Sequence, residues 1–196
     1  MTGWLWWLQA VAWAGDVSPT PLWEAVSPEG AAWTQHVLQE LPVLGPEILD
    51  GVPADMADFC PRYPELTVDE RSHVWAYLLS AMARYESNFS VSSAYTENFT
   101  DAAGDAVISR GLLQISLESS QGYDCGFTSA EQLHDPFHNL SCGIRILNRW
   151  IGQDRRISGK VDGKWKGGSR YWAVLRDTRE AYAKVLARME EVAICQ

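Results

Sequence analysis

The sequence has no surplus of positive charge, and this lack sets the first limit on what the protein binds. Of its 196 residues, 16 are Lys or Arg and 25 are Asp or Glu, so the formal net charge is -9. Nucleic acids and anionic membranes attract basic surfaces, so we expect neither nucleic-acid binding nor simple attraction to a membrane. An acidic surface is better suited to a cationic or neutral partner.

Long hydrophobic runs are also missing. The first fourteen residues carry no charge and hold four of the ten tryptophans, but they are too few to span a bilayer. Ala12-Trp13-Ala14 before Gly15 has the small-residue pattern of a signal cleavage site, although no positive n-region precedes it. We expect residues 1–14 to be a signal peptide, the protein to be exported, and no stable membrane insertion. The alternative is an apolar helix packed on the domain.

Cysteine is scarce, and none of it has the CxxC spacing of a metal or redox site. In an exported chain an even number of cysteines suggests disulfides, and four cysteines allow three pairings. We favour Cys125–Cys142, which would brace a loop against the next helix, and Cys60–Cys195, which would tie the N-terminal region to the C-terminus. Reduced, buried cysteines are the alternative.

Metal-binding patterns are weak as well. His134 and His138 are four residues apart, but Pro136 lies between them, so they are not expected to share a helical face. The sequence therefore predicts no metal site, and it contains no motif that implies another cofactor.

Strand-like alternation is rare, which predicts a mostly α fold with a small β-hairpin near residues 91–110. The Pro- and Ser-rich residues 15–30 are typical of a linker, and residues 31–196 are expected to form one domain. Its expected segments are a helix over 31–41, short turns over the Pro-rich 45–66, a helix from Asp135-Pro136 to about 150, a Gly/Lys-rich loop over 152–170, and a last helix over 178–192 capped by Asp177.

The strongest helix signal follows Thr67, which forms a T-x-x-E capping box with Glu70. Four positions of this helix are four residues apart and therefore share one face: Val74, Leu78, Met82 and Glu86. Because the first three are apolar, we expect the carboxyl of Glu86 to be partly desolvated. Burial and the negative end of the helix dipole both favour its protonated form.

Three motifs then occur in one order along the chain. They are Glu86-Ser87, Gly111-Leu112-Leu113-Gln114-Ile115 and Asn139-Leu140-Ser141-Cys142-Gly143. The order and rough spacing resemble the lysozyme-like superfamily, specifically the soluble lytic transglycosylase (SLT) domain and goose-type lysozymes, over about residues 67–151. Leu113 stands where the family commonly has Met. The family's later Ala-Tyr-Asn signature is absent, and Gly168-Ser169-Arg170-Tyr171-Trp172 occupies that region.

The resemblance implies a lysozyme-like helical fold and an enzyme that cleaves the MurNAc-GlcNAc β-1,4 bond of peptidoglycan. Glu86 would be the general acid that protonates the leaving oxygen. Ser87, Gln114 and Tyr171 would contact substrate, and Asn139 would orient the region by capping backbone groups. The protein is expected to act as a monomer.

A second carboxylate would decide the type of reaction. A hydrolysing enzyme needs a base that activates water, and Asp105, eleven residues before Ser116, matches one position at which goose-type lysozymes carry an aspartate. A lytic transglycosylase needs no second carboxylate and releases a 1,6-anhydro sugar. The sequence leaves both reactions open.

The substrate is open in the same way. The acidic composition suits partly deacetylated peptidoglycan, whose free amines are cationic. Two further functions stay possible: a chitosanase- or chitinase-like hydrolase of the same superfamily, and a non-catalytic glycan-binding domain.

Overall fold

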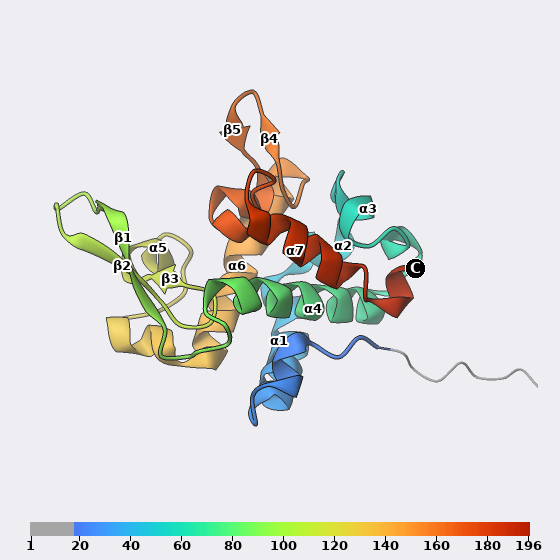
Figure 1. Ribbon diagram of the computed structural model, residues 1–196, viewed down its shortest axis with the longest axis horizontal. Helices are drawn as coiled ribbons and strands as arrows, with labels where there is room; N and C mark the ends of the chain where they lie inside the picture. The colour runs from blue at the N-terminus through green and yellow to red at the C-terminus, as the bar shows by residue number, and fades with distance from the viewer. Residues whose placement is uncertain (1–17) are drawn as a thin grey trace, which may run out of the picture.

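The computed structural model describes residues 18–196 and is mostly α, as predicted (Figure 1). The predicted signal peptide lies outside the described residues. The α-helices are α1 (Gly30–Leu44), α2 (Pro46–Asp50), α3 (Met56–Phe59), α4 (Val68–Glu86), α5 (Leu117–Gln121), α6 (Pro136–Asp154) and α7 (Glu180–Met189). Short 3-10 helices are η1 (Leu22–Ala25), η2 (Tyr63–Glu65), η3 (Ala130–His134), η4 (Gly167–Arg170), η5 (Ala173–Leu175) and η6 (Ala193–Cys195).

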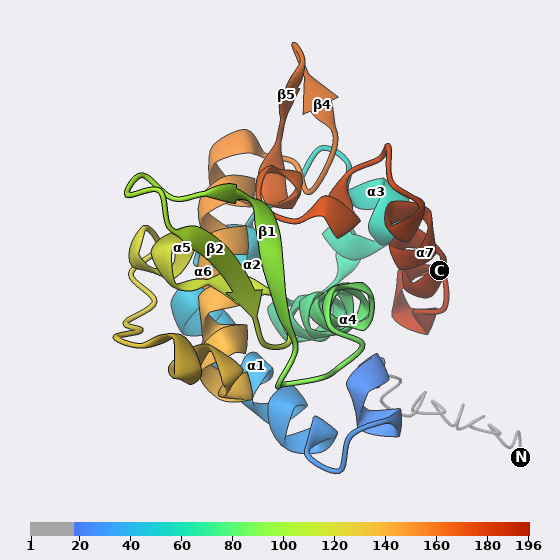
Figure 2. The same ribbon diagram turned by 60° about the vertical axis from the view of Figure 1, so that its left-hand side comes forward.

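Helix α4 runs through the middle of the molecule, with α1, α6 and α7 around it (Figures 1 and 2). The predicted capping box is present: Thr67 Oγ1 accepts from the Glu70 N–H at 3.3 Å, and Glu70 Oε2 accepts from the Thr67 N–H at 2.8 Å. Every residue from Val74 to Ala83 is buried. A helix packed on all sides holds its last residue, Glu86, in a fixed place.

The described part of the predicted linker is packed structure instead. Trp23 in η1 is fully buried, and its indole N–H donates to Thr34 Oγ1 at 2.8 Å. The Leu22 N–H donates to Ser80 Oγ of α4 at 2.9 Å. Burial of the large apolar side chain of Trp23 stabilises the packing of this segment on the core, so the segment belongs to the domain.

The predicted hairpin is confirmed as β1 (Ala94–Thr100) and β2 (Ala106–Arg110), which continue into β3 (Ile115–Ser116) as one antiparallel sheet of order β1-β2-β3. Tyr95 pairs with Ser109 and Thr96 with Ile108, after which the register shifts before Thr100. Such irregularities re-aim side chains and bend the strand.

Two predictions for the C-terminal part are corrected. The Gly/Lys-rich stretch is not a plain loop, because it contains a second hairpin of β4 (Lys160–Val161) and β5 (Lys164–Trp165), followed by η4. Asp177 does not cap the last helix: α7 begins at Glu180, after Arg179, which makes no side-chain cap bond. A turn ending in the hydrogen bond from the Arg179 N–H to the Arg176 carbonyl occupies the expected first turn.

The disulfides are Cys60–Cys195 and Cys125–Cys142, the pairing favoured from the sequence. The first closes a loop of 135 residues and joins the two ends of the domain. The second fastens the loop after α5 to α6 across 17 residues. Two disulfides are compatible with an oxidising, exported environment. Within residues 18–196, no helix is both long and apolar enough to cross a membrane.

Candidate active site

A cleft of about 850 Å³ is lined by the β1–β2 hairpin and by the chain from η4 to the start of α7. The C-terminal end of α4 reaches into it. Polar and aromatic side chains dominate the lining, which includes Glu86, Tyr95, Glu97, Phe99, Ser109, Gln114, Arg170, Tyr171, Trp172, Arg176 and Arg179. A groove that is open at the surface and rich in aromatic and polar groups suits an extended, polar chain.

Glu86 lies in this cleft as the last residue of α4. Burial, followed by the negative charge of Glu97, raises its pKa to about 8, against weaker opposing effects of the Val174 backbone and Arg176. The expectation of a desolvated carboxyl is therefore met. At neutral pH such a group is mostly protonated, so it can donate a proton to a neighbouring oxygen.

Glu97 is a second carboxylate in the cleft, and it was not predicted. It follows Thr96, where the register between β1 and β2 becomes irregular. Buried Ser109, on β2, donates its hydroxyl to Glu97 Oε1 at 2.6 Å. This bond fixes one oxygen of a carboxylate that lines the cleft.

The turn 111–115 contributes Gln114 to the cleft lining, and Asn139 of α6 holds the turn in place. The Asn139 side chain accepts from the Leu113 N–H at 2.9 Å and donates to the carbonyls of Arg110 and Leu133, at 3.1 and 2.9 Å. The Trp172 indole N–H donates to the Leu113 carbonyl at 2.8 Å. One buried amide of α6 thus links the turn around residues 110–113 to the end of η3.

Close packing explains why two positions in the second and third motifs are occupied by glycine. Gly111 has a φ of +74°, and a Cβ there would overlap the Leu133 carbonyl and the Asn139 amide. A Cβ on Gly143 would overlap the side chain of Leu113. The second and third motifs are therefore two sides of one contact.

Ser87 and Gln114 were both predicted to contact substrate, and the structure separates them. Ser87 is buried outside the cleft lining and donates to the Leu112 carbonyl at 2.8 Å, so it ties the end of α4 to the turn. Gln114 lines the cleft. Its NH₂ group donates to the carbonyls of Gly111 and Ser93, which leaves its amide oxygen for a ligand.

Tyr171, also predicted at the site, lines the cleft near Glu86. Burial raises the pKa of its hydroxyl to about 12, and the negative charge of Glu86 adds to this rise. Tyr171 is therefore a neutral donor at physiological pH. Trp172 packs against it with ring centroids 4.6 Å apart.

Asp105, the predicted candidate base, does not line the cleft. It is exposed in the turn between β1 and β2, where its backbone N–H donates to Asp101 Oδ1 at 2.9 Å. Asp101 is occupied with the same turn. Both aspartates shape the hairpin tip, which is a common use of aspartate in turns.

A signal for Glu97 was present in the sequence. In a strand, residues two apart share one face, so Tyr95, Glu97 and Phe99 point the same way if 91–110 is a hairpin. A carboxylate between two aromatic residues on one strand face is the pattern of a polar binding wall. All three line the cleft, and the two aromatic residues are 61% and 58% exposed.

The described part of the chain contains no cluster of side chains that could form a metal site. No group of three or more His, Cys, Asp or Glu side chains comes together within residues 18–196. His134 instead contacts the Val91 carbonyl at 2.8 Å, and His138 lies 3.3 Å from Asp135.

Comparison with known proteins identifies the family of this chain. The model of the transglycosylase SLT domain family matches residues 66–166, whereas no curated protein sequence matches significantly. The solved structure of wild-type Bd0314 DslA is 52% identical, with a TM-score of 0.87, and covers 90% of this chain and 97% of its own. A variant of DslA is 51% identical, with a TM-score of 0.89, and covers 91% and 99%. By sequence and by fold, this chain belongs to the transglycosylase SLT domain family.

Proposed function

We propose that this protein cleaves the MurNAc-GlcNAc β-1,4 bond of peptidoglycan glycan strands with Glu86 as the general acid. Membership of the SLT family supports a peptidoglycan-cleaving role of the lytic-transglycosylase kind. The observation that carries the finer proposal is the pKa of about 8 on Glu86 inside the cleft. Cleavage of a glycosidic bond requires protonation of the leaving oxygen, and a carboxyl protonated at neutral pH supplies that proton.

Glu97 is proposed as the second catalytic carboxylate. Its Oε1 is held by Ser109, and its negative charge is close enough to raise the pKa of Glu86. Once Glu86 has protonated the leaving oxygen, Glu97 accepts a proton from a water molecule that attacks the anomeric carbon. Two carboxylates with different protonation states divide the acid and base roles between them.

The structures of DslA support this pair. Two of its solved variants replace a glutamate by glutamine, at positions eleven residues apart. Glu86 and Glu97 are also eleven residues apart. In a relative with 52% identity and 90% coverage, an equal spacing favours equivalent positions.

The products distinguish hydrolysis from transglycosylation. We expect the purified protein to clear a suspension of cell walls and to release fragments with reducing ends, because Glu97 provides a base for water. Mass spectrometry of the fragments measures this, since a 1,6-anhydro end is lighter by one water. Anhydro ends would contradict the role of Glu97 as the base but would agree with Glu86 as the general acid. Binding to walls without clearing would indicate a glycan-binding domain instead.

A preference for partly deacetylated strands is proposed for the same cleft. A free 2-amino group is cationic near neutral pH and would be attracted by Glu97 on the β1 wall. We expect deacetylated walls to be cleaved faster than acetylated walls at low salt, with the difference shrinking as salt screens the charges. Equal rates on both walls at low salt would contradict this preference. Chitosan, tested in parallel, separates a peptidoglycan enzyme from a chitosanase.

Residues 18–196 are proposed to act as one catalytic domain in an exported monomer. The packed N-terminal segment around Trp23 and the Cys60–Cys195 disulfide both tie the ends of the chain to the same core.

A further inference from the structure

Half of the basic side chains gather in one short part of this acidic protein. Residues 155–179 hold eight of the sixteen Lys and Arg residues and only two acidic ones, Asp162 and Asp177. The segment therefore carries a formal charge of +6, whereas the remainder of the chain carries -15. Such a separation of charge produces a local positive field on a molecule whose net charge is negative.

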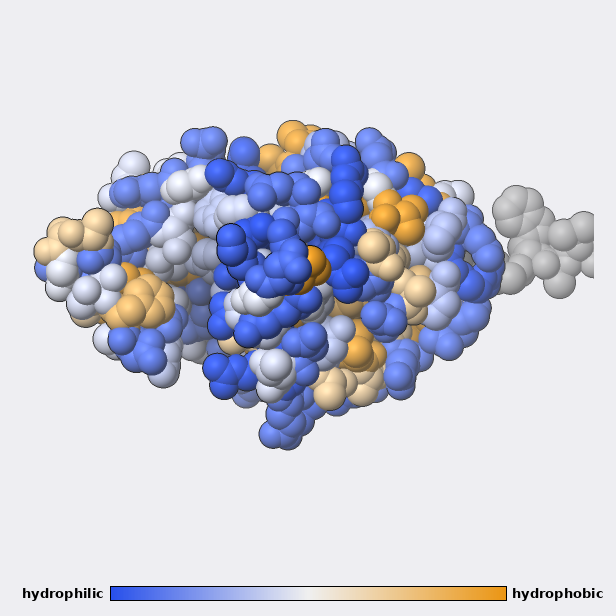
Figure 3. Space-filling model, turned by 90° about the horizontal axis from the view of Figure 1, so that it is seen from above, coloured by the Kyte–Doolittle hydropathy of each residue, from blue (hydrophilic) through white to orange (hydrophobic). Residues whose placement is uncertain are grey.

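The centre of this segment projects from the molecule. The β4–β5 hairpin stands out beyond the helices in both ribbon views (Figures 1 and 2). Seen from above, hydrophilic residues gather at the middle of that face (Figure 3). Lys160 and Lys164 are exposed on the two strands. Lys160 pairs with Trp165 and Val161 with Lys164, so the side chains of Lys160 and Trp165 lie on one face of the hairpin and that of Lys164 lies on the other.

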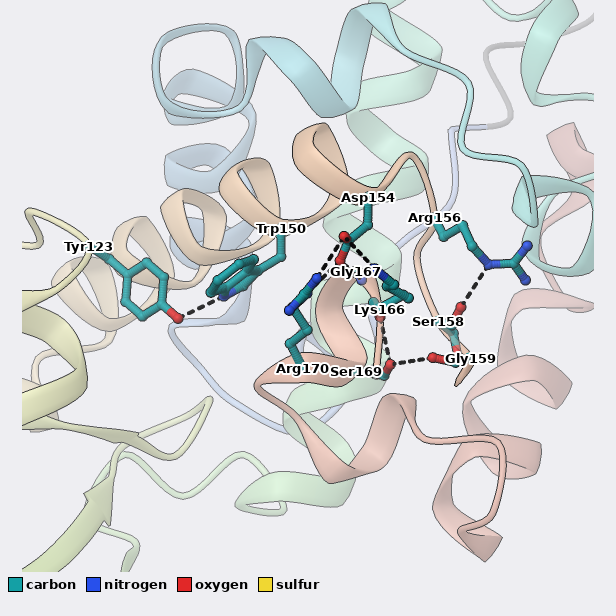
Figure 4. Close-up of polar contacts among 10 residues, drawn as sticks. All are labelled: Tyr123, Trp150, Asp154, Arg156, Ser158, Gly159, Lys166, Gly167, Ser169 and Arg170. Carbon is teal, nitrogen blue, oxygen red and sulfur yellow. Dashed lines mark hydrogen bonds and ion pairs between the residues drawn. The ribbon is translucent and has the colours of Figure 1, made fainter. Parts of the chain in front are cut away.

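The base of the hairpin is fixed by Asp154 at the end of α6 (Figure 4). Asp154 accepts from Arg170 at 2.6 and 2.8 Å and from the Gly167 N–H at 2.8 Å, and it lies 3.5 Å from Lys166 Nζ. The Arg170 side chain is the main reason that the pKa of Asp154 is lowered to about 2. Arg170 and Lys166 are thus used in the fold, and the hairpin above them is held in place before any ligand arrives.

Trp165 joins the hairpin to the catalytic cleft. Lys160 Nζ lies 4.6 Å from its ring centroid on one side, and the Arg176 guanidinium lies 5.3 Å from it. Arg176 and Arg179 line the cleft. Three cationic side chains, Lys160, Arg176 and Arg179, therefore extend from the cleft onto one face of the hairpin; we name them the basic surface.

The chemistry of the strand decides what the basic surface fits. An acetylated glycan backbone carries no charge, and a deacetylated one is cationic, so neither calls for a row of cations. The carboxylates of peptidoglycan are on the peptide stems, which branch from the glycan and project out of a cleft that holds it. Lys and Arg side chains bind carboxylates through charge-assisted hydrogen bonds.

We propose that the basic surface binds the acidic peptide stems of the glycan strand held in the cleft. This inference rests on the proposed function, because the strand must occupy the cleft for its stems to reach β4 and β5. Glu86 and Glu97 would then contact the sugar, whereas the side chains of the basic surface would contact the peptide stem.

The test measures binding of labelled, soluble glycan fragments in two forms, with their stems and after an amidase has removed them. The lactyl carboxyl that this removal exposes on MurNAc is converted to its amide, so that the stem-free form carries no carboxylate. A Glu86→Gln protein is used so that neither form is cut. We expect tighter binding of the stem-bearing form, and we expect Lys160→Glu to reduce that preference roughly threefold, as one exposed charge allows. Adding Arg179→Glu reduces the preference further, and added salt weakens it.

Arg145→Glu is the matched control, because Arg145 is exposed on α6, lies outside the cleft lining and gives the same change of charge. The preference for stems should be unchanged in this variant. Equal binding of both fragments, or equal loss in Arg145→Glu and Lys160→Glu, would overturn the inference. Tighter, Lys160-dependent binding of an isolated phosphodiester wall polymer would also overturn it, in favour of that polymer.

The outcomes separate this inference from the proposed function. Wall cleavage by the unaltered protein without any preference for stems overturns the basic surface alone. A preference for stems without wall cleavage supports the basic surface and overturns the proposed catalysis.

Discussion

Replacing Glu86 by glutamine is expected to lower the rate of glycan cleavage by about 10²- to 10⁴-fold, the usual contribution of a general acid. Glutamine keeps the shape of the side chain but cannot release a proton to the leaving oxygen. Turbidity of purified walls and the rate of fragment release measure the loss. The unaltered enzyme should also lose activity as pH rises through about 8, where Glu86 ionises.

The same substitution has a stability signature that does not depend on activity. The pKa of Glu86 is about 8 in the folded protein and 4.5 in a model peptide, so the folded state holds its proton more tightly. Below pH 4.5 both states are protonated. Between pH 4.5 and 8 the unfolded state loses the Glu86 proton while the folded state keeps it. The free energy of unfolding therefore decreases as pH rises through this range.

Glutamine has no such titration. The melting temperature of Glu86→Gln relative to the unaltered protein should therefore increase from pH 5 to pH 8.5. Glu29→Gln is the matched control, because Glu29 is exposed before α1 and outside the cleft lining, and it should show neither effect. Near-normal cleavage by Glu86→Gln at pH 7 would remove Glu86 from the mechanism.

Replacing Glu97 by glutamine is the second large effect that we expect, with a loss of hydrolysis of about 10²-fold or more. Glutamine cannot accept a proton from the attacking water. It also removes the negative charge that raises the pKa of Glu86, so the alkaline limb of the remaining activity should move to lower pH. A profile of rate against pH on soluble glycan fragments measures both changes.

Asp105→Asn is the decisive comparison, since Asp105 lies in the same hairpin but outside the cleft. It should cleave at close to the normal rate. If Asp105→Asn were inactive and Glu97→Gln active, the second carboxylate would be Asp105, as the sequence pattern suggested. If both variants kept full activity and released anhydro ends, Glu86 would act alone.

The position of Glu86 is a feature that local sequence patterns could predict. A capping box fixes where α4 begins, and a period of four places Glu86 on the face of Val74, Leu78 and Met82. These relations are local in the chain, so they survive without knowledge of the fold. The disulfide pairs were favoured on other grounds: Cys125–Cys142 braces a loop against the next helix, and Cys60–Cys195 ties the N-terminal region to the C-terminus.

The side-chain positions of Asp105 and Ser87 could not be predicted from such local patterns. Asp105 was chosen by counting along the chain, but in a hairpin the direction of a side chain depends on pairing register, which is set by contacts with the other strand. Glu97 lies on the strand face of Tyr95 and Phe99 and lines the cleft, whereas Asp105 lies in the exposed turn. Ser87 follows the catalytic position in sequence, yet the end of the helix turns it towards the Leu112 carbonyl.

The sequence by itself therefore determined the fold class, the central helix, the place of Glu86 at the end of that helix and the motifs that pack the turn 111–115 against α6, because each depends on neighbours within a few turns of helix or on the residue types that close packing requires. Only the tertiary structure decided the partner of Glu86, the cleft that raises its pKa and the basic surface beside it. These features depend on residues distant in the chain, and their electrostatic effect falls with distances that no local pattern contains.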